Sequence, residues 1–284
     1  MNKYKNQQIK NIFLKQLSRL FLLAVTIITL YPVFWNLYSS FKTNKEFLTD
    51  ALALPASLEW DNYVRAWSAA NISTNFSNSA LAVLILLTVL IIFVIPCSYV
   101  LARYTFFGSK LMLNLFMAAI FIKATYIMIP LFLQMNNLGL INQLVPYSVL
   151  YTVTQFPFSI FLMVGFMKAI PVDYEEAARI DGCSNFRILT QIIAPMAKPG
   201  IMTVCMLSAI AIWNEYPVAL VMLTDDKVMT LPVSLAQLNV RAGYYSDYGA
   251  LFAALMIVLV PTIGAYAIGQ RYLIQGVGAG GVKG

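Results

Sequence analysis

The stretch PVDYEEAARIDGCSNFRILTQIIAPMAKPG, Pro171 to Gly200, is a charged interruption in a chain that is otherwise mostly apolar. Asp173, followed three residues later by Glu176, predicts a capping box at the start of a helix. Carboxylates in a first helical turn are favoured by the helix dipole. Gly182 predicts the end of that helix, because glycine tolerates a left-handed backbone.

A second short helix is expected directly after this turn. Ser184 predicts its N-cap, and the helix should continue through Ile193. Pro195 should end it, because proline lacks a backbone N–H and clashes with the preceding turn. The stretch therefore predicts a helix–turn–helix between two apolar spans, built to dock on a partner.

The composition identifies the rest of the chain as membrane-embedded. Of 284 residues, 60% are hydrophobic and only 11% charged, with a mean hydropathy of +0.74. A soluble domain carries about 25% charged residues. The net charge of +7 comes from basic residues dispersed between apolar spans, which indicates membrane topology and no nucleic-acid partner.

Several chemical functions find no support in the sequence. There is no histidine, and the three cysteines show no spacing typical of a disulfide framework or a metal site. No nucleotide-binding loop or nucleophile elbow is present. The chain is therefore expected to be no enzyme and to bind no cofactor itself, so any ATP hydrolysis must occur on another subunit.

The hydropathy pattern predicts an all-α, polytopic membrane protein with six transmembrane helices. Each apolar run is close to the roughly 20 residues that cross a bilayer core. The first helix is expected at 20–41, after an N-terminal segment 1–19 and before an external loop 42–75. The remaining spans belong to a transmembrane domain 76–272, with the docking loop 171–200 inside it and a tail 273–284 after it. Their expected positions are 79–101, 111–133, 145–167, 201–223 and 248–272.

Charge assigns a side to the loops. The side that holds the N-terminus carries thirteen lysines and arginines, against five on the other side, and Lys123 falls within a span. Cytoplasmic loops carry the excess of basic residues. Both termini and the docking loop are therefore expected in the cytoplasm of a bacterial cell.

The docking loop resembles a known motif. Glu176-Ala177-Ala178, Gly182, Ile192 and Pro195 have the spacing of the EAA motif of ABC-importer membrane subunits, with Ala194 where that family usually has leucine. Further stretches are similar to the maltose-type carbohydrate permeases, and the resemblance covers nearly the whole chain. These stretches are 58–63, 138–142, 213–215 and 276–284.

The resemblance implies a coupling helix that seats in a cleft of an ATP-binding subunit. Glu175 and Glu176 would meet basic residues there, Ala177 and Ala178 would allow close approach, and Gly182 would set the turn. Asp181 completes the coupling set. The implied partners are a second, related permease subunit, two ATP-binding subunits holding ATP and Mg, an extracytoplasmic solute-binding protein, and a sugar substrate.

A substrate path is expected around the polar residues inside the spans. Lys123, Tyr126 and Gln134 are spaced to share one helical face. A central lysine costs about 2.5–3.5 kcal/mol on insertion scales, so it should face a cavity or a partner. Either it contacts the companion subunit or Glu215, or it donates to substrate. For Asn214 and Glu215, too, either a contact within the transporter or a contact with substrate is expected.

Two further expectations concern the last external loop and the class of protein. Tyr244 and Tyr245 are candidates for contact with the binding protein, against the alternative of a solvated turn. The same machinery could instead import a glycerophosphodiester or polyol. From other classes, a proton-coupled secondary carrier with Glu215 as its carboxylate, and a membrane scaffold, remain open.

Overall fold

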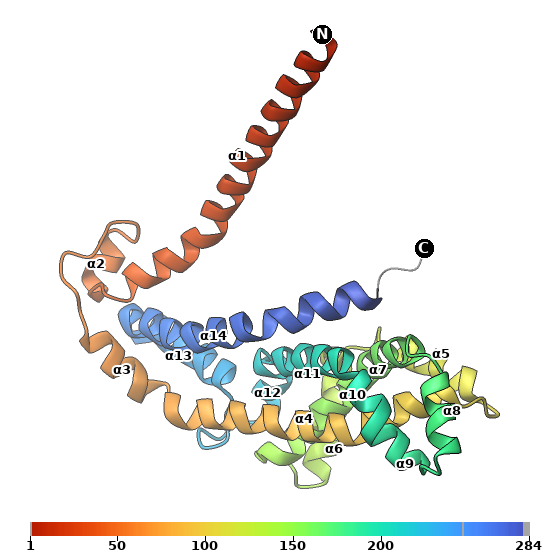
Figure 1. Cartoon of the computed structure of the whole chain (residues 1–284). Coiled ribbons are helices and arrows are strands. Elements are labelled where there is room, and N and C mark those ends of the chain that lie inside the picture. Colours follow the sequence, from red (N-terminus) through yellow and green to blue (C-terminus); the bar gives the residue numbers. More distant parts are fainter. Residues whose placement is uncertain (1, 246, 281–284) are drawn as a thin grey trace. The chain divides into compact units, whose positions relative to one another are not determined.

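The computed structural model describes the backbone of residues 2–245 and 247–280, and the side chains of 14–244, 247–264, 266 and 267. Within these residues every regular element is helical, as expected for the all-α class (Figure 1). The elements are α1 (Asn2–Ser39), α2 (Asn44–Thr49), α3 (Asp61–Ala69), α4 (Ile72–Arg103), α5 (Ser109–Ala119), η1 (Ala124–Ile127), α6 (Met128–Asn137), α7 (Leu144–Lys168), α8 (Asp173–Ile180), α9 (Asn185–Ile188), the π-helical turn η2 (Leu189–Ile193), α10 (Ala194–Met196), α11 (Lys198–Trp213), α12 (Pro217–Met222), α13 (Leu231–Tyr245) and α14 (Tyr248–Gly280).

The chain forms two compact units. One comprises residues 1–69 and 238–260, and the other comprises residues 70–237 and 261–284. One boundary directly follows α3, and the other two fall inside α13 and α14. The predicted boundary at 19/20 is not a break in the backbone, because α1 runs through it as one helix.

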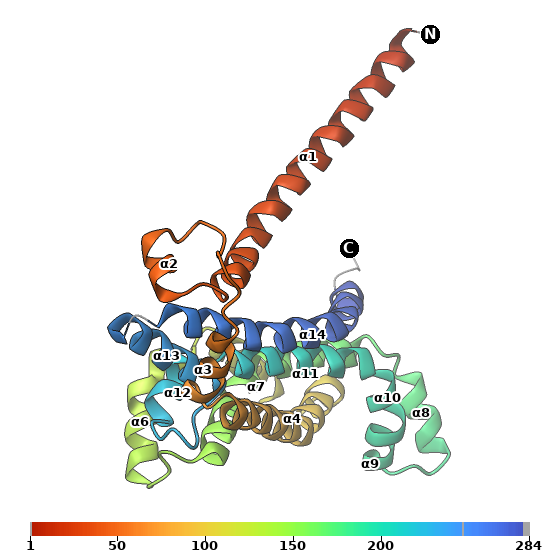
Figure 2. The same cartoon turned by 90° about the vertical axis from the view of Figure 1, so that its left-hand side faces the viewer.

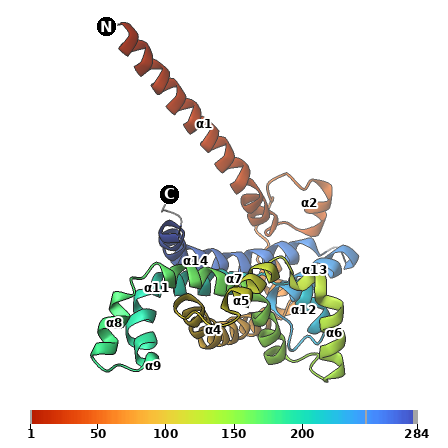
Figure 3. The same cartoon turned by 90° about the vertical axis from the view of Figure 1, so that its right-hand side faces the viewer.

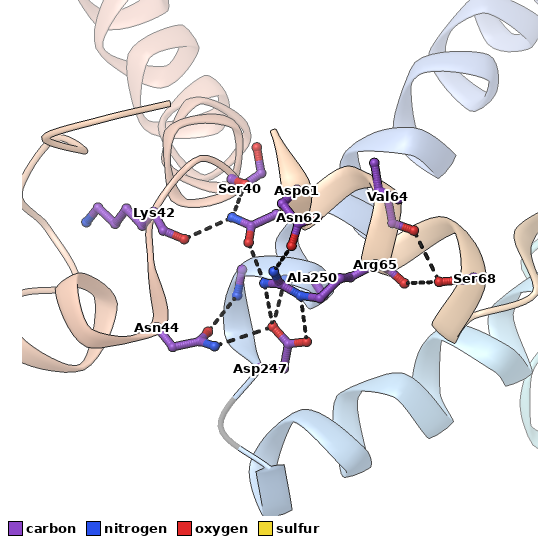
Figure 4. A network of polar contacts seen from close by, with 11 residues as sticks. Ser40, Lys42, Asn44, Asp61, Asn62, Val64, Arg65, Ser68, Asp247 and Ala250 are labelled. Atoms are coloured by element: carbon purple, nitrogen blue, oxygen red, sulfur yellow. Dashed lines mark hydrogen bonds and ion pairs between the residues drawn. The ribbon is translucent and has the colours of Figure 1, made fainter. Parts of the chain in front are cut away.

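In the first unit, residues 42–69, most of the loop expected at 42–75, are organised by a polar network (Figure 4). Arg65 of α3 pairs with Asp61 and reaches Asp247, 3.2 Å away at the start of α14. The hydrogen bonds that the Arg65 guanidinium donates to the Asp247 carboxylate raise the pKa of Arg65 above its ordinary value. Asn62 donates to the carbonyl oxygens of Ser40 and Lys42, both at 2.9 Å. These bonds join the end of α1, α3 and the start of α14.

The second unit holds the main hydrophobic core. α4 packs along α7 and α11, and all three lie side by side in Figures 1 and 2. Leu86, Leu90, Ile160 and Met163 are among its fully buried residues. The N-terminal turn of α11 approaches α7 so closely that a Cβ on Gly200 would lie 2.4 Å from the Phe166 ring.

The six predicted spans differ in regularity. Three helices in the described residues are long and apolar enough to cross a membrane: 14–39 in α1, α4 and α7. The span expected at 111–133 is broken, since α5 and the segment 124–137 meet at 85°. The helices 185–196 and 198–213 meet at 78° and count as a fifth candidate. By length and composition the structure thus supports three to five spans, and the six-span count stays a prediction.

The span expected at 201–223 is also interrupted. α11 ends at Trp213, and α12 begins only at Pro217. Part of the polar segment expected at 224–247 is the helix α13. Hydropathy averages over a window and therefore does not detect a break of a few residues between two apolar helices.

Candidate functional sites: a polar cavity and an exposed helical hairpin

A cavity of about 440 Å³ lies in the second unit where the two helix interruptions meet. One wall is the segment between α5 and η1, which carries Lys123. Another wall is the segment between α11 and α12, which carries Asn214 and Glu215. α7 supplies the side between them, including Tyr151 and Gln155.

The structure brings three of the five predicted path residues together and corrects their arrangement. Lys123, Asn214 and Glu215 line the cavity, while Tyr126 and Gln134 do not. The prediction that Lys123, Tyr126 and Gln134 share one helical face is wrong. Lys123 has an extended backbone, and Tyr126 lies in the 3₁₀ turn that follows. The face was predicted from α-helical spacing, which does not apply across this break.

Both carboxylate oxygens of Glu215 accept hydrogen bonds from residues of the second unit. Its carboxylate accepts from the Tyr147 hydroxyl at 2.6 Å and from the backbone N–H groups of Val218 and Ala219 at 2.7 and 2.9 Å. Glu215 is buried, with 6% of its surface exposed. It therefore satisfies first-turn amides of α12, which have no partner within that helix.

Of the alternatives for Lys123, the contact with Glu215 is not formed. In the described part of the chain, the three ion pairs involve other residues. The Lys123 side chain is exposed at the cavity instead. Sequence reasoning also missed Tyr147, Tyr151 and Gln155. These three residues are spaced four apart along α7, which places them on one helical face and could have indicated a polar surface. In an apolar helix, however, the same spacing is typical of ordinary core packing.

The residues that follow α6 and α12 are hydrogen-bonded to each other. Asn142, in the turn after α6, has a left-handed backbone with φ of 58°. Its side-chain oxygen accepts from the backbone N–H groups of Thr224 and Asp225 at 2.6 and 3.0 Å, and its own N–H donates to Met222 at 2.9 Å. This connection holds the end of α12 against the segment that follows α6.

The docking loop forms the helix–turn–helix that the sequence predicts, with α8 and α9 adjacent in Figures 2 and 3. Gly182 is left-handed at φ +80°, and the Ser184 hydroxyl caps α9, as expected. Two details differ. Asp173 is the first residue of α8 and makes no side-chain cap, so the capping box is absent. Pro195 lies inside α10 and does not end the helical path, which bends after Met196.

The coupling set divides into a buried and an exposed part. Glu175 and Ala178 are buried, at 1% and 5% exposed, whereas Glu176, Ala177 and Asp181 are exposed. Glu175 therefore has no surface for the expected meeting with a partner's basic residues in this structure. Large apolar side chains of the hairpin are exposed as well: Tyr174, Ile180 and Phe186.

The external tyrosines are only partly described. Tyr244 is 83% exposed near the end of α13. The side chain of Tyr245 lies outside the described residues. The contact with a binding protein stays a prediction for both residues.

Comparison with known proteins identifies the class. The family model described as "binding-protein-dependent transport system inner membrane component" matches residues 11–277. The chain belongs to this family, which makes it a multi-pass membrane subunit of a transport system and not an enzyme. The predicted resemblance to ABC-importer permeases is thereby confirmed.

Individual relatives are matched over most of their length. The diacetylchitobiose uptake system permease of Streptomyces coelicolor is 33% identical, over 93% of this chain and 87% of the relative. The multiple sugar-binding transport system permease of Streptococcus mutans is 33% identical, over 90% and 93%. A solved bacterial ABC transporter that imports alginate shares the fold, with a TM-score of 0.76 and 24% identity over 90% of this chain and 95% of that one.

Proposed function

We propose that the chain forms half of the translocation path of an ATP-driven importer for a sugar or oligosaccharide. The observation that carries this proposal is the polar cavity at the meeting of two interrupted helices. Transporters commonly build substrate sites from discontinuous helices, because the freed backbone groups then face a cavity and not lipid.

The chemistry of the cavity suits a polyhydroxylated ligand. Lys123 offers donors only, while Gln155 and Asn214 offer both donors and acceptors. Tyr151 and Phe158 add aromatic surface on which a sugar ring can pack. The relatives named for diacetylchitobiose and multiple sugars support a carbohydrate over the alternative of a polyol or glycerophosphodiester.

We assign the remaining parts of the machinery to other chains. A second permease subunit would complete the path, two ATP-binding subunits would supply the energy, and a solute-binding protein would deliver the sugar. A related alginate transporter has been solved with its periplasmic protein bound. The basic-residue bias supports cytoplasmic termini in the bacterial cell membrane.

The exposed face of α8 is the proposed contact with the ATP-binding subunit. Glu176 and Ala177 lie on it, with Ile180 at 87% exposed. An apolar patch of this kind beside charged groups is typical of a protein interface. Gly182 forms the turn after α8 with a φ of +80°, a conformation that would strain any residue with a Cβ.

Uptake of labelled oligosaccharide by the assembled complex in vesicles tests the proposal. We expect uptake to require ATP and the binding protein and to persist when the proton gradient is collapsed. Glu176→Lys and Gly182→Asp should abolish uptake while the subunit still inserts. Lys110→Glu, a charge reversal at the exposed start of α5, is the matched control. Uptake that follows the proton gradient and continues without ATP would instead establish a secondary carrier.

A further inference from the structure

The C-terminal end of α4 is joined to the proposed coupling helix α8 by a buried ion pair. Arg103 Nε donates to Glu175 Oε1 at 2.5 Å, and the Tyr99 hydroxyl donates to Glu175 Oε2 at 2.9 Å. The side chains of Arg103 and Glu175 are only 7% and 2% exposed. Arg103 Nη2 also donates to the carbonyl oxygen of Ile170, just before α8, at 2.8 Å. Both carboxylate oxygens are thus occupied from within the chain.

A second contact holds the next turn of α8 to the same place. Arg179 donates to the Tyr104 hydroxyl at 3.1 Å, and its guanidinium lies 6.0 Å from the centre of that ring. Glu175 and Arg179 are four residues apart and therefore share one face of α8. Ala178, on the same side, is buried. One face of α8 is directed to α4, and the opposite face remains exposed.

The Arg103–Glu175 ion pair connects two helices, α4 and α8, that are far apart in sequence. The chain connects α8 directly only to α7 and α9, and 72 residues separate Arg103 from Glu175. α4 packs along α7 and α11, and α7 and α11 both reach the cavity. A buried charge pair resists separation, because either partner alone would be an uncompensated charge in a low-dielectric environment.

We propose that Glu175 is a positioning residue that links the coupling helix to α4, and that it makes no contact with the ATP-binding subunit. Displacement of α8 then moves α4 directly, in addition to pulling on the backbone connections. This inference rests on the proposed function, since it assigns to α8 the role of receiving force. The inference gives the two adjacent glutamates different roles. Glu176 contacts the ATP-binding subunit, and Glu175 contacts α4 of the same chain.

The first test uses the assembled complex with Glu175→Gln, Arg103→Gln and their combination. Asp173→Asn, at an exposed carboxylate of the same helix, is the matched control. We expect each single variant to keep its ATP-binding subunits and to hydrolyse ATP, while transport per ATP hydrolysed falls by about tenfold or more. The double variant should be no worse than either single one, because both remove the same link. Arg103→Lys, which keeps the charge, should restore part of the transport.

A distance measurement tests the link without depending on transport. Spin labels at positions 173 and 100, in a background lacking the three cysteines, report the separation of α8 and α4. We expect one narrow distance distribution with and without ATP, and a broadened one in Arg103→Gln.

Two results would overturn the inference. One is loss of the ATP-binding subunits in Glu175→Gln but not in Arg103→Gln, which would put Glu175 in direct contact with the partner. The other is wild-type transport together with an unchanged distance distribution in both variants. If the wild-type complex shows no ATP-driven uptake, the proposed function fails, and the distance measurement still decides whether the link exists.

Discussion

Replacing Glu215 should destabilise the fold around the cavity before it changes any chemistry there. Glu215→Ala leaves three buried donors without their acceptor: the Tyr147 hydroxyl and the N–H groups of Val218 and Ala219. Each unsatisfied buried donor costs about 1–3 kcal/mol. With one of them compensated by water from the adjacent cavity, two unsatisfied donors remain, and we expect a net loss of about 2–6 kcal/mol.

Two milder variants calibrate this value. Glu215→Gln keeps the shape and one acceptor oxygen, so it should cost about 1–2 kcal/mol. Tyr147→Phe removes only one donor, and its effect should not add to that of Glu215→Ala, since the shared bond is already lost.

The assay is thermal unfolding of the purified complex followed by intrinsic fluorescence. At about 2–4 °C per kcal/mol, Glu215→Ala should lower the apparent Tm by roughly 4–24 °C and Glu215→Gln by roughly 2–8 °C. Glu215→Gln should also retain ATP-driven uptake. The reasoning is refuted if both variants melt with the wild type and both lose uptake, because the carboxylate would then act in proton transfer and not as a helix cap.

Three further predictions concern close packing and a helix cap. Gly200→Ala places a Cβ against the Phe166 ring and should cost about 1–3 kcal/mol, seen as a lower Tm of the complex; an unchanged Tm would show that α11 and α7 can separate freely. Gly249→Ala meets the Asn62 amide at 2.7 Å and should loosen the start of α14, measured as faster amide hydrogen exchange in 247–252; slow exchange would contradict the packing. The backbone hydrogen bond from Thr43 lowers the pKa of Glu46, so the α2 cap contributes its full stability above the ordinary glutamate pKa and loses it as the pH falls through the lowered pKa. Amide hydrogen exchange in α2 should become faster over that fall in pH, and Glu46→Gln should show the fast rate already at neutral pH. An exchange rate in α2 that does not depend on pH in this way would disprove the role of Glu46.

Local sequence features predicted the helix–turn–helix structure of the docking loop. The turn at Gly182 and the cap at Ser184 depend on backbone preferences of one or two residues, which the sequence states directly. The predictions at Asp173 and Pro195 were wrong, although both residues have the local preference that was assigned to them. Asp173 lies one position inside the helix, where its side chain cannot cap it, and Pro195 is accommodated near a bend.

The sequence by itself determined the class of the protein, the apolar elements and the position of the docking loop, because hydropathy and turn chemistry are properties of neighbouring residues. The tertiary structure alone decided which side chain each buried charge meets. Glu215 meets Tyr147 and not Lys123, and Glu175 meets Arg103. These pairs lie 68 and 72 residues apart in the chain, so only the packing of α4, α7, α8 and α11 brings them within hydrogen-bonding distance.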